Sequence, residues 1–186
     1  MSGSEPLLTL EPLLEAVREG LEGDGWELSG LQKTTSYEFE GRWAGESSRS
    51  AYLFFHAEGV PDSVSIDVFL DETNRGLKGN LALVVDGPEL SRVRDPEGVL
   101  SHLAGVARTA LPEGYRTPLT LRYRLGKLGG IPAESDTEYR FKLYIPPQAL
   151  SAGHSAVAAL AAITARAFRE ILNSRELCPF LAPEEP

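Results

Sequence analysis

The sequence predicts an α+β fold in which an antiparallel sheet is flanked by three helices, in the order helix, four or five strands, helix, two strands, helix. Near both ends of the chain and in its middle, apolar residues recur every three or four positions, which is the period of a helix. Between these segments they recur at every second position, which is the period of a strand. Short connections rich in turn residues join the first strands, which favours antiparallel neighbours.

The chain is expected to form a single α+β domain over residues 1–186, with residues 178–186 as a flexible tail. This length can bury a core without disulfides or metals. The longest apolar run is far shorter than the roughly 20 residues of a membrane helix, and the first residues lack the basic start of an export signal. The lone Cys178 can form neither an internal disulfide nor a cysteine metal cluster. We therefore expect a cytoplasmic protein without membrane contact.

The charge distribution is uneven, with a net charge of −9 and all of the excess in the first half. Residues 1–93 carry 7 basic and 17 acidic side chains, whereas residues 94–186 carry 11 and 10. Phosphate binding is driven by clustered Lys and Arg, so direct binding of nucleic acid is not expected.

The first helix is expected to begin after Thr9, which can cap it, and to run for about three turns. Its apolar stripe consists of Leu10, Leu13, Leu14, Val17 and Leu21. Gly20, Gly23 and Gly25 are expected to end it.

The strand period then dominates from about Trp26 to Asp86, and 26–31 is a possible fifth strand beside four others. Tyr37, Phe39 and Trp43 alternate with charged residues and predict a half-buried strand. The segment AYLFFHAEG, residues 51–59, is apolar on both faces and predicts a central strand that is covered on each side. Residues 63–70 and 80–85 complete this group. The inward residues of 63–70 are Val64, Ile66, Val68 and Leu70.

Asp95 followed by Pro96 predicts an N-cap and the start of the second helix, which ends at 112–114. Two clean alternations then predict strands at 119–125 and 137–145. The eleven residues between them, GKLGGIPAESD, are long for a hairpin and rich in glycine, which predicts a mobile loop.

The last helix, Ser155 to Leu172, has seven alanines in eighteen residues. The alanines of its second face remove bulk without adding charge, so this helix is expected to be covered twice, by its own sheet and by another surface. The interface residues that this hypothesis names are Ala156, Val157, Leu160, Ala161, Thr164 and Phe168. The alternative is that the alanine content reflects only a composition bias.

Four basic residues gather on the two strands of the second half. If 119–125 and 137–145 pair, Arg122, Arg124, Arg140 and Lys142 project from one face as a basic stripe. Like charges on adjacent strands repel unless opposite charges lie beside them. These opposite charges come from within the chain, from Glu38, Glu40 or other acids of the first half, or they belong to an acidic segment of a partner.

No motif predicts catalysis, a metal site or a cofactor. Gly153 to Val157 resembles part of a nucleophile elbow, but Val157 replaces the last glycine and no histidine follows Ser155. The segments 71–76 and 124–130 lack the ligands of a calcium loop and the pattern of a phosphate-binding loop. The three histidines, His56, His102 and His154, are too far apart for metal-ligand spacing. Glu134, Asp136 and Glu138 are expected to form a solvated turn.

The segment TEYRFKLYIPPQALSAGHSAVAALAAITARAFREIL, a strand that ends in a prolyl turn before a long terminal helix, supplies the best local resemblance to a known family. This pattern and the order of elements resemble the YbjN-like bacterial proteins and the type III secretion chaperones. The resemblance implies a small, acidic, non-enzymatic homodimer that binds another protein. Its client is expected to be a secreted, stress-response or nucleic-acid-handling protein.

Two classes of function therefore stay open. The first is a dimeric, chaperone-like adaptor whose partner adds a segment to the sheet or lies along the basic stripe. The second is a small-ligand-binding module or enzyme with a cavity between the sheet and the last helix, into which His56, Tyr123 or Tyr139 would reach.

Overall fold

The computed structural model describes residues 9–35, 49–73, 75–87, 93–113, 115, 119–128 and 131–181. Its helices are α1 (Leu10–Gly23), α2 (Pro96–Ala110), α3 (Pro147–Ala152), α4 (His154–Leu172) and α5 (Cys178–Leu181). Its strands are β1 (Trp26–Thr35), β2 (Arg49–Ala57), β3 (Val64–Thr73), β4 (Gly76–Gly87), β5 (Leu119–Leu128) and β6 (Ile131–Tyr144). The predicted α+β class is confirmed, and 26–31 is part of a true strand. The strand expected around Tyr37, Phe39 and Trp43 lies outside the described residues.

The strands form one antiparallel sheet in the order β1-β2-β3-β4-β6-β5. The expected pairing of the two later strands is confirmed, with Leu121 opposite Tyr139. The predicted mobile loop between them is wrong, because β5 and β6 continue pairing out to Leu128 opposite Ile131. Only Gly129 and Gly130 separate the two strands in sequence.

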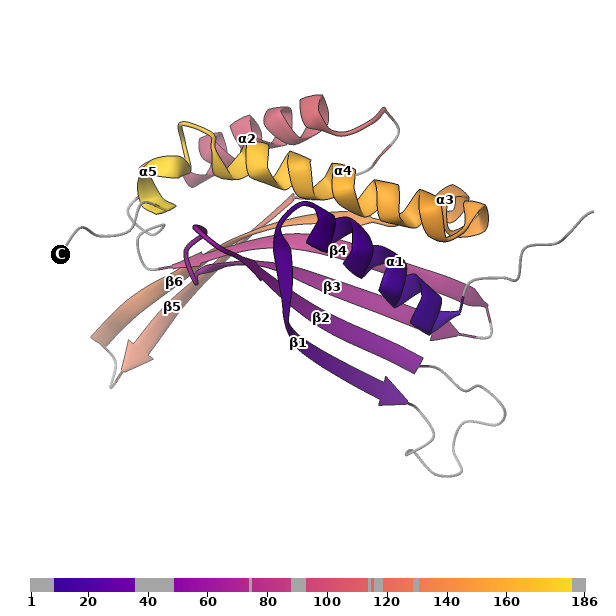
Figure 1. Cartoon of the computed structure of the whole chain (residues 1–186). Coiled ribbons are helices and arrows are strands. Elements are labelled where there is room, and N and C mark those ends of the chain that lie inside the picture. Colours follow the sequence, from indigo (N-terminus) through magenta and orange to yellow (C-terminus); the bar gives the residue numbers. More distant parts are fainter. Residues whose placement is uncertain are drawn as a thin grey trace, which may run out of the picture.

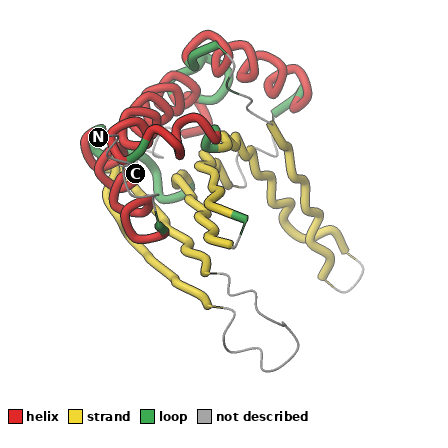
Figure 2. The backbone as a smooth tube through the Cα atoms, turned by 90° about the vertical axis from the view of Figure 1, so that its right-hand side faces the viewer, coloured by secondary structure: helices red, strands yellow, loops and turns green. Residues whose placement is uncertain are grey.

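The helices all lie on one face of this sheet (Figure 1). The view from the side shows the same two layers, with the helices stacked together and the strands beneath them (Figure 2). No helix within the described ranges has the length and apolar character of a membrane span.

The core lies between the two layers. Every second residue of β3, from Val64 to Leu70, is buried there, as the alternation predicted. The helices supply Leu13 and Val17 from α1, and Leu160 and Phe168 from α4. At about 25 cal/mol per Å² of apolar surface removed from water, this burial is the main force that holds the helices on the sheet.

β2 differs from its prediction. Its burial alternates, with Leu53 and Phe55 fully buried but Tyr52 41% and Phe54 38% exposed. The strand is central, between β1 and β3, but it is covered on one face only. Two aromatic residues on the uncovered face therefore gave a pattern that imitates burial on both sides.

α1 and α4 pack unusually close together, and this explains the small residues of α4. A Cβ atom added at Gly20 would lie 2.6 Å from the Cβ atom of Ala161, well inside contact distance. α1 therefore continues through Gly20, which was expected to end it, because this glycine lets the two backbones approach. The second surface that covers α4 includes another helix of the same chain.

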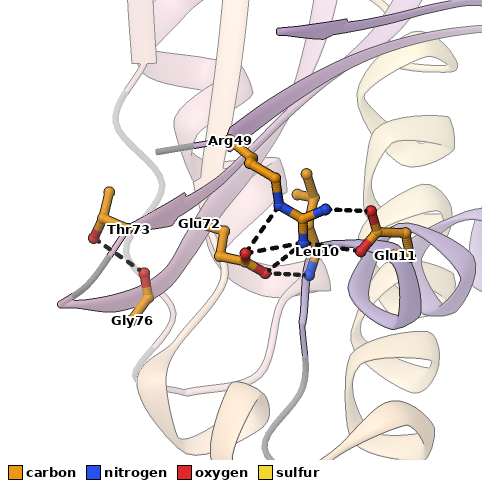
Figure 3. A network of polar contacts seen from close by, with 6 residues as sticks. All are labelled: Leu10, Glu11, Arg49, Glu72, Thr73 and Gly76. Carbon is orange, nitrogen blue, oxygen red and sulfur yellow. Dashed lines mark hydrogen bonds and ion pairs between the residues drawn. The ribbon is translucent and has the colours of Figure 1, made fainter. Parts of the chain in front are cut away.

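α1 is tied to the sheet at its first turn (Figure 3). The Glu72 carboxylate on β3 accepts a hydrogen bond from the Leu10 amide at 2.7 Å. It thereby pairs one of the backbone N–H groups at the helix start that have no acceptor within the helix. Arg49 on β2 donates to Glu72 at 3.0 Å and to Glu11 at 2.6 Å. The Arg49 guanidinium holds the pKa of the Glu11 carboxyl below its usual range.

The helix caps follow the sequence in part. The Asp95 side chain accepts from the Gly98 amide at 3.0 Å, so the predicted cap of α2 is confirmed. Thr9 occupies the N-cap position of α1, but its side chain makes no capping hydrogen bond. α4 begins at His154 after the shorter α3, and the residue between them, Gly153, has a φ of 101° that favours glycine.

Candidate protein-binding surface

The face of the sheet opposite the helices carries the features that best define a functional site, and we call it the open face. Four strands supply most of it through their alternate residues. They are Ser50, Tyr52, Phe54 and His56 of β2; Ser65, Asp67, Phe69 and Asp71 of β3; Lys78, Asn80, Ala82, Val84 and Asp86 of β4; and Glu138, Arg140, Lys142 and Tyr144 of β6. Antiparallel sheets often turn one face to water, but that face is then usually polar.

Aromatic side chains cross the open face in a band. The rings of Tyr52 and Phe69 lie 4.8 Å apart between centroids, within the range of a favourable aromatic pair. Phe69 lies opposite Asn80, and Asn80 opposite Tyr144, which is 52% exposed. Together with the exposed Phe54, these aromatic residues form the aromatic band. Large exposed apolar patches are uncommon on monomeric proteins and mark interaction sites, so several exposed aromatic side chains on one face favour such a site.

The basic stripe is present, but part of its charge is paired with acidic residues of the same chain. The Arg140 guanidinium donates to Glu138 at 3.0 Å and lies 3.8 Å from the Asp67 carboxylate. Arg122 is exposed and stands directly opposite Glu138 in the β5–β6 register. The sequence left two sources of counter-charge open. For Arg140 the source is internal, because Asp67 of the acidic first half lies beside it.

The other members of the stripe differ from Arg140. Lys142 is half-buried, with its ammonium 6.0 Å from the centroid of the Tyr144 ring. Arg124 lies opposite Asp136 along the backbone, and its side chain falls outside the described residues, as do Glu38 and Glu40. Lys142 thus lies beside the aromatic band, so a cation and an aromatic ring are neighbours on the open face.

Asp67 is the carboxylate at the centre of the open face. Burial raises the pKa of Asp67, although the Ser65 hydroxyl, which donates at 2.8 Å, and the Arg140 charge both favour its ionised form. The desolvation cost is therefore only partly offset within one chain. Asp67 lies beside Phe54, its partner in the β2–β3 register.

The residues proposed to reach into a cavity under the last helix are separated by the sheet. His56 lies on the open face, where its ring nitrogen is 2.7 Å from the Ser29 hydroxyl, so this part of the cavity hypothesis is wrong. Tyr139 lies on the opposite, inner face and is fully buried. Burial raises the pKa of its hydroxyl, and the Asp95 carboxylate adds to the effect. Tyr123 has no described side chain.

The six predicted interface residues of the last helix mostly face the core of their own chain. Val157, Leu160, Ala161, Thr164 and Phe168 are buried, and Ala156 is half-buried. The Thr164 hydroxyl donates to the Leu160 carbonyl at 2.8 Å, so its polar group is satisfied inside the helix. In this fold these side chains join α4 to its neighbours and do not present a free surface.

A hollow of about 710 Å³ lies between α2 and α4, on the helical side of the molecule. Six of its lining residues are small or apolar, and three are charged or ionisable. The first set is Ser101, Gly105, Val106, Thr109, Ala110 and Ala167, and the second is His102, Arg166 and Glu170. A volume of this size suits a small molecule.

The remaining candidates from the sequence form no reactive constellation in the described residues. Ser155 is exposed in the first turn of α4, and the neighbouring His154 contacts Glu19 at 2.5 Å. His102 pairs with Glu176 at 2.9 Å. Three or more potential metal ligands do not gather anywhere in the described part of the chain. Residues 131–136 continue β6, so Glu134 and Asp136 belong to a strand and not to a turn.

Sequence reasoning found the basic stripe and missed the aromatic band. Tyr52 and Phe54 alternate with buried residues, and nothing in that short pattern tells a covered face from an open one. The missing signal was the position of the helices, which depends on tertiary packing.

Fold and surface together define the class: an α+β protein with a six-stranded antiparallel sheet, covered by helices on one face and aromatic and charged on the other. The chain matches no family model, no curated protein and no solved structure. The resemblance to the YbjN-like proteins and type III secretion chaperones therefore stays a prediction.

Proposed function

We propose that this protein is a non-enzymatic, chaperone-like or adaptor protein of the cytoplasm whose function is to bind another protein chain through the open face of its sheet. One observation carries the proposal: three of the large hydrophobic side chains that are more than a third exposed, Tyr52, Phe54 and Tyr144, share that face. Aromatic residues supply the largest contact energies in protein interfaces.

The charges around the aromatic band fit this function. Arg122 and Lys142 flank it on one side, and Asp71 and Asp86 lie on its other strands. A protein interface has an apolar centre and a polar, charged rim, and the rim sets orientation and partner choice more than affinity. The bound chain belongs to a client protein or to a second copy of this one.

The test is a quantitative pull-down from extract of the source organism, with mass spectrometry of co-eluting proteins. We expect Tyr52→Ser combined with Phe54→Ser to lose the captured protein, while Arg108→Gln on α2, on the helical side of the molecule, keeps it. These changes all lie on exposed positions, so folding should survive, and circular dichroism checks this. Equal capture by both variants would argue against the open face as the binding surface.

The α2–α4 hollow favours a second candidate function, the binding of a small ligand. A compound that binds there would raise the melting temperature saturably in a thermal-shift screen. Gly105→Leu would fill the hollow and abolish the rise in melting temperature. The double variant Tyr52→Ser, Phe54→Ser on the open face would leave that rise unchanged.

A further inference from the structure

Resting on the second proposed function, the binding of a small ligand in the α2–α4 hollow, we infer that this ligand is a free amino acid with an apolar side chain. Its carboxylate pairs with Arg166 and its ammonium pairs with Glu170. Its side chain lies against the apolar part of the lining, which Val106, Ala110 and Ala167 supply.

The first argument is the shape of the hollow. α2 and α4 lie side by side and run in opposite directions, since His102 in the first half of α2 contacts Glu176, which follows the end of α4 (Figure 1). Gly105 leaves space between the two helices, because a Cβ atom added there would have no neighbour within 4 Å. The volume of about 710 Å³ lies within the range of roughly 300–1,000 Å³ that is usual for ligand sites.

The second argument is the apolar part of the lining. Ala167 is buried, and Val106 and Ala110 are half-buried and pack against the hydrophobic core. The hollow therefore reaches from the surface to the edge of the core. An apolar side chain that covers these residues is removed from water together with them, which favours binding in proportion to the apolar area that is buried.

The third argument is a pair of opposite charges on α4. Arg166 and Glu170 lie about one helical turn apart, and both are exposed and line the hollow. Arg18 and Glu22 have the same order and spacing on α1, and there the two side chains pair at 2.6 Å. In the described part of the chain, Arg166 and Glu170 form no such pair with each other. Both charges therefore remain for a ligand.

Nearby ionisable side chains of the helical layer have partners within the chain. The Arg169 guanidinium donates to the Asp24 carboxylate at 3.0 Å. The His102 ring contacts Glu176 at 2.9 Å. Among the described lining residues, Arg166 and Glu170 are thus the charged groups that a ligand would neutralise.

The fourth argument is the match between these two charges and an amino acid. Residues four apart on a helix have Cβ atoms about 5–6 Å apart, so both side chains can reach neighbouring groups of one small molecule. The Arg166 guanidinium has paired N–H donors that fit a carboxylate, and the Glu170 carboxylate accepts from an ammonium. A ligand with a carboxylate alone would bring its negative charge close to Glu170. A zwitterion pairs with both groups.

The test is isothermal titration calorimetry with L-phenylalanine, L-leucine and L-methionine, of which at least one is expected to bind saturably. Two analogues of that amino acid are then compared with it. The N-acetyl derivative lacks the ammonium, and the amide lacks the carboxylate. Each analogue leaves one charged side chain of α4 without its partner, so each is expected to bind wild type about tenfold more weakly than the amino acid does.

Two variants assign the contacts to their side chains. Arg166→Gln is expected to bind the amide at least as well as the amino acid, while the N-acetyl derivative still binds more weakly. Glu170→Gln is expected to show the reverse preference. Both positions are exposed, so folding should survive, and circular dichroism checks this. A purely structural effect of either substitution would weaken all three compounds together.

Three further variants test the location of the site. Gly105→Leu fills the hollow and is expected to abolish binding of the amino acid. Arg108→Gln lies on α2 outside the lining, and the double variant Tyr52→Ser, Phe54→Ser lies on the open face. Both of these controls are expected to bind the amino acid as wild type does.

The outcomes separate this inference from the function on which it rests. Analogues that bind as tightly as the amino acid, or a Gly105→Leu variant that binds it as tightly as wild type, would overturn the inference. If none of the three amino acids bound, the inference would also fall. The hollow would then stand as a ligand site if the thermal-shift screen gave a compound whose effect Gly105→Leu abolishes. If the screen gave none either, both proposals for the hollow would fall, and protein binding by the open face would be unaffected.

Discussion

At the scale of single residues, Gly20 shows how one missing side chain sets the distance between two helices. Replacing it with Ala would push the new methyl group against Ala161 and the Ala158 carbonyl. Because overpacking of a tight contact costs about 1–3 kcal/mol, we expect Gly20→Ala to lower the free energy of unfolding by about that amount. Urea denaturation measures it.

Gly23 provides the matched control for Gly20. It lies in the same helix with no atom near its prospective Cβ, so Gly23→Ala should be neutral or stabilise by up to about 1 kcal/mol through helix propensity. Equal effects at both positions would mean that α1 and α4 do not pack as closely as described.

Asp67 gives a pH dependence whose sign can be worked out. Burial raises its pKa in the folded chain, so its ionisation opposes folding. This penalty is absent below the pKa of the unfolded chain and grows as pH rises through the folded pKa. The groups that face Asp67 are Arg140 and Glu138 from β6 and His56 from β2.

We expect Asp67→Asn to raise the free energy of unfolding at pH 7 and to have little effect well below the unfolded pKa of the carboxyl. Chemical denaturation across this pH range measures the difference. A loss of stability at pH 7 would show that the ion pair with Arg140 outweighs the cost of burying the carboxylate.

At the scale of elements, the two helix starts test how far local sequence determines a cap. Asp95→Ala removes a side chain that accepts from the Gly98 amide, and such losses cost about 1 kcal/mol. Thr9→Ala should cost much less, because the Thr9 side chain makes no capping bond and Glu72 already accepts from the Leu10 amide. Thermal unfolding of the two variants compares them. Equal losses would show that both caps act alike.

Elements with a strong local signal were predictable from the sequence. The alternation of Val64 to Leu70 and the Asp95-Pro96 helix start both predicted what the structure shows. The full length of β5 and β6 was hidden because Gly126 and Pro132 are poor strand formers, a preference that pairing with a neighbour overrides. The open face was beyond reach because the choice of covered face depends on where α1, α2 and α4 dock.

At the scale of the whole molecule, the basic stripe was predicted from the sequence, but its pairing within the chain was not. Sequence periodicity placed Arg140 and Lys142 on one face, and the register confirms this. The counter-charge from Asp67 comes from a strand distant in sequence, and only the sheet order β3-β4-β6 brings it near them. A single helical layer also leaves one face of the described sheet without helices, which a composition cannot reveal.

The one-sided architecture predicts an uneven distribution of stability across the sheet. Strands β3 and β4 have paired neighbours on both sides and helices above, whereas β1 is an edge in the described sheet. Edge amides that point away from the sheet lack a strand partner, and local opening exposes the others at low cost. We therefore expect the amides of Val68 and Leu83 to exchange with solvent only through global unfolding, and those of Leu31 and Lys33 to exchange much faster. Hydrogen exchange followed by NMR measures these rates. If the β1 amides were protected as well as those of β3, a further strand would have to cover that edge, and partners would then be limited to the open face.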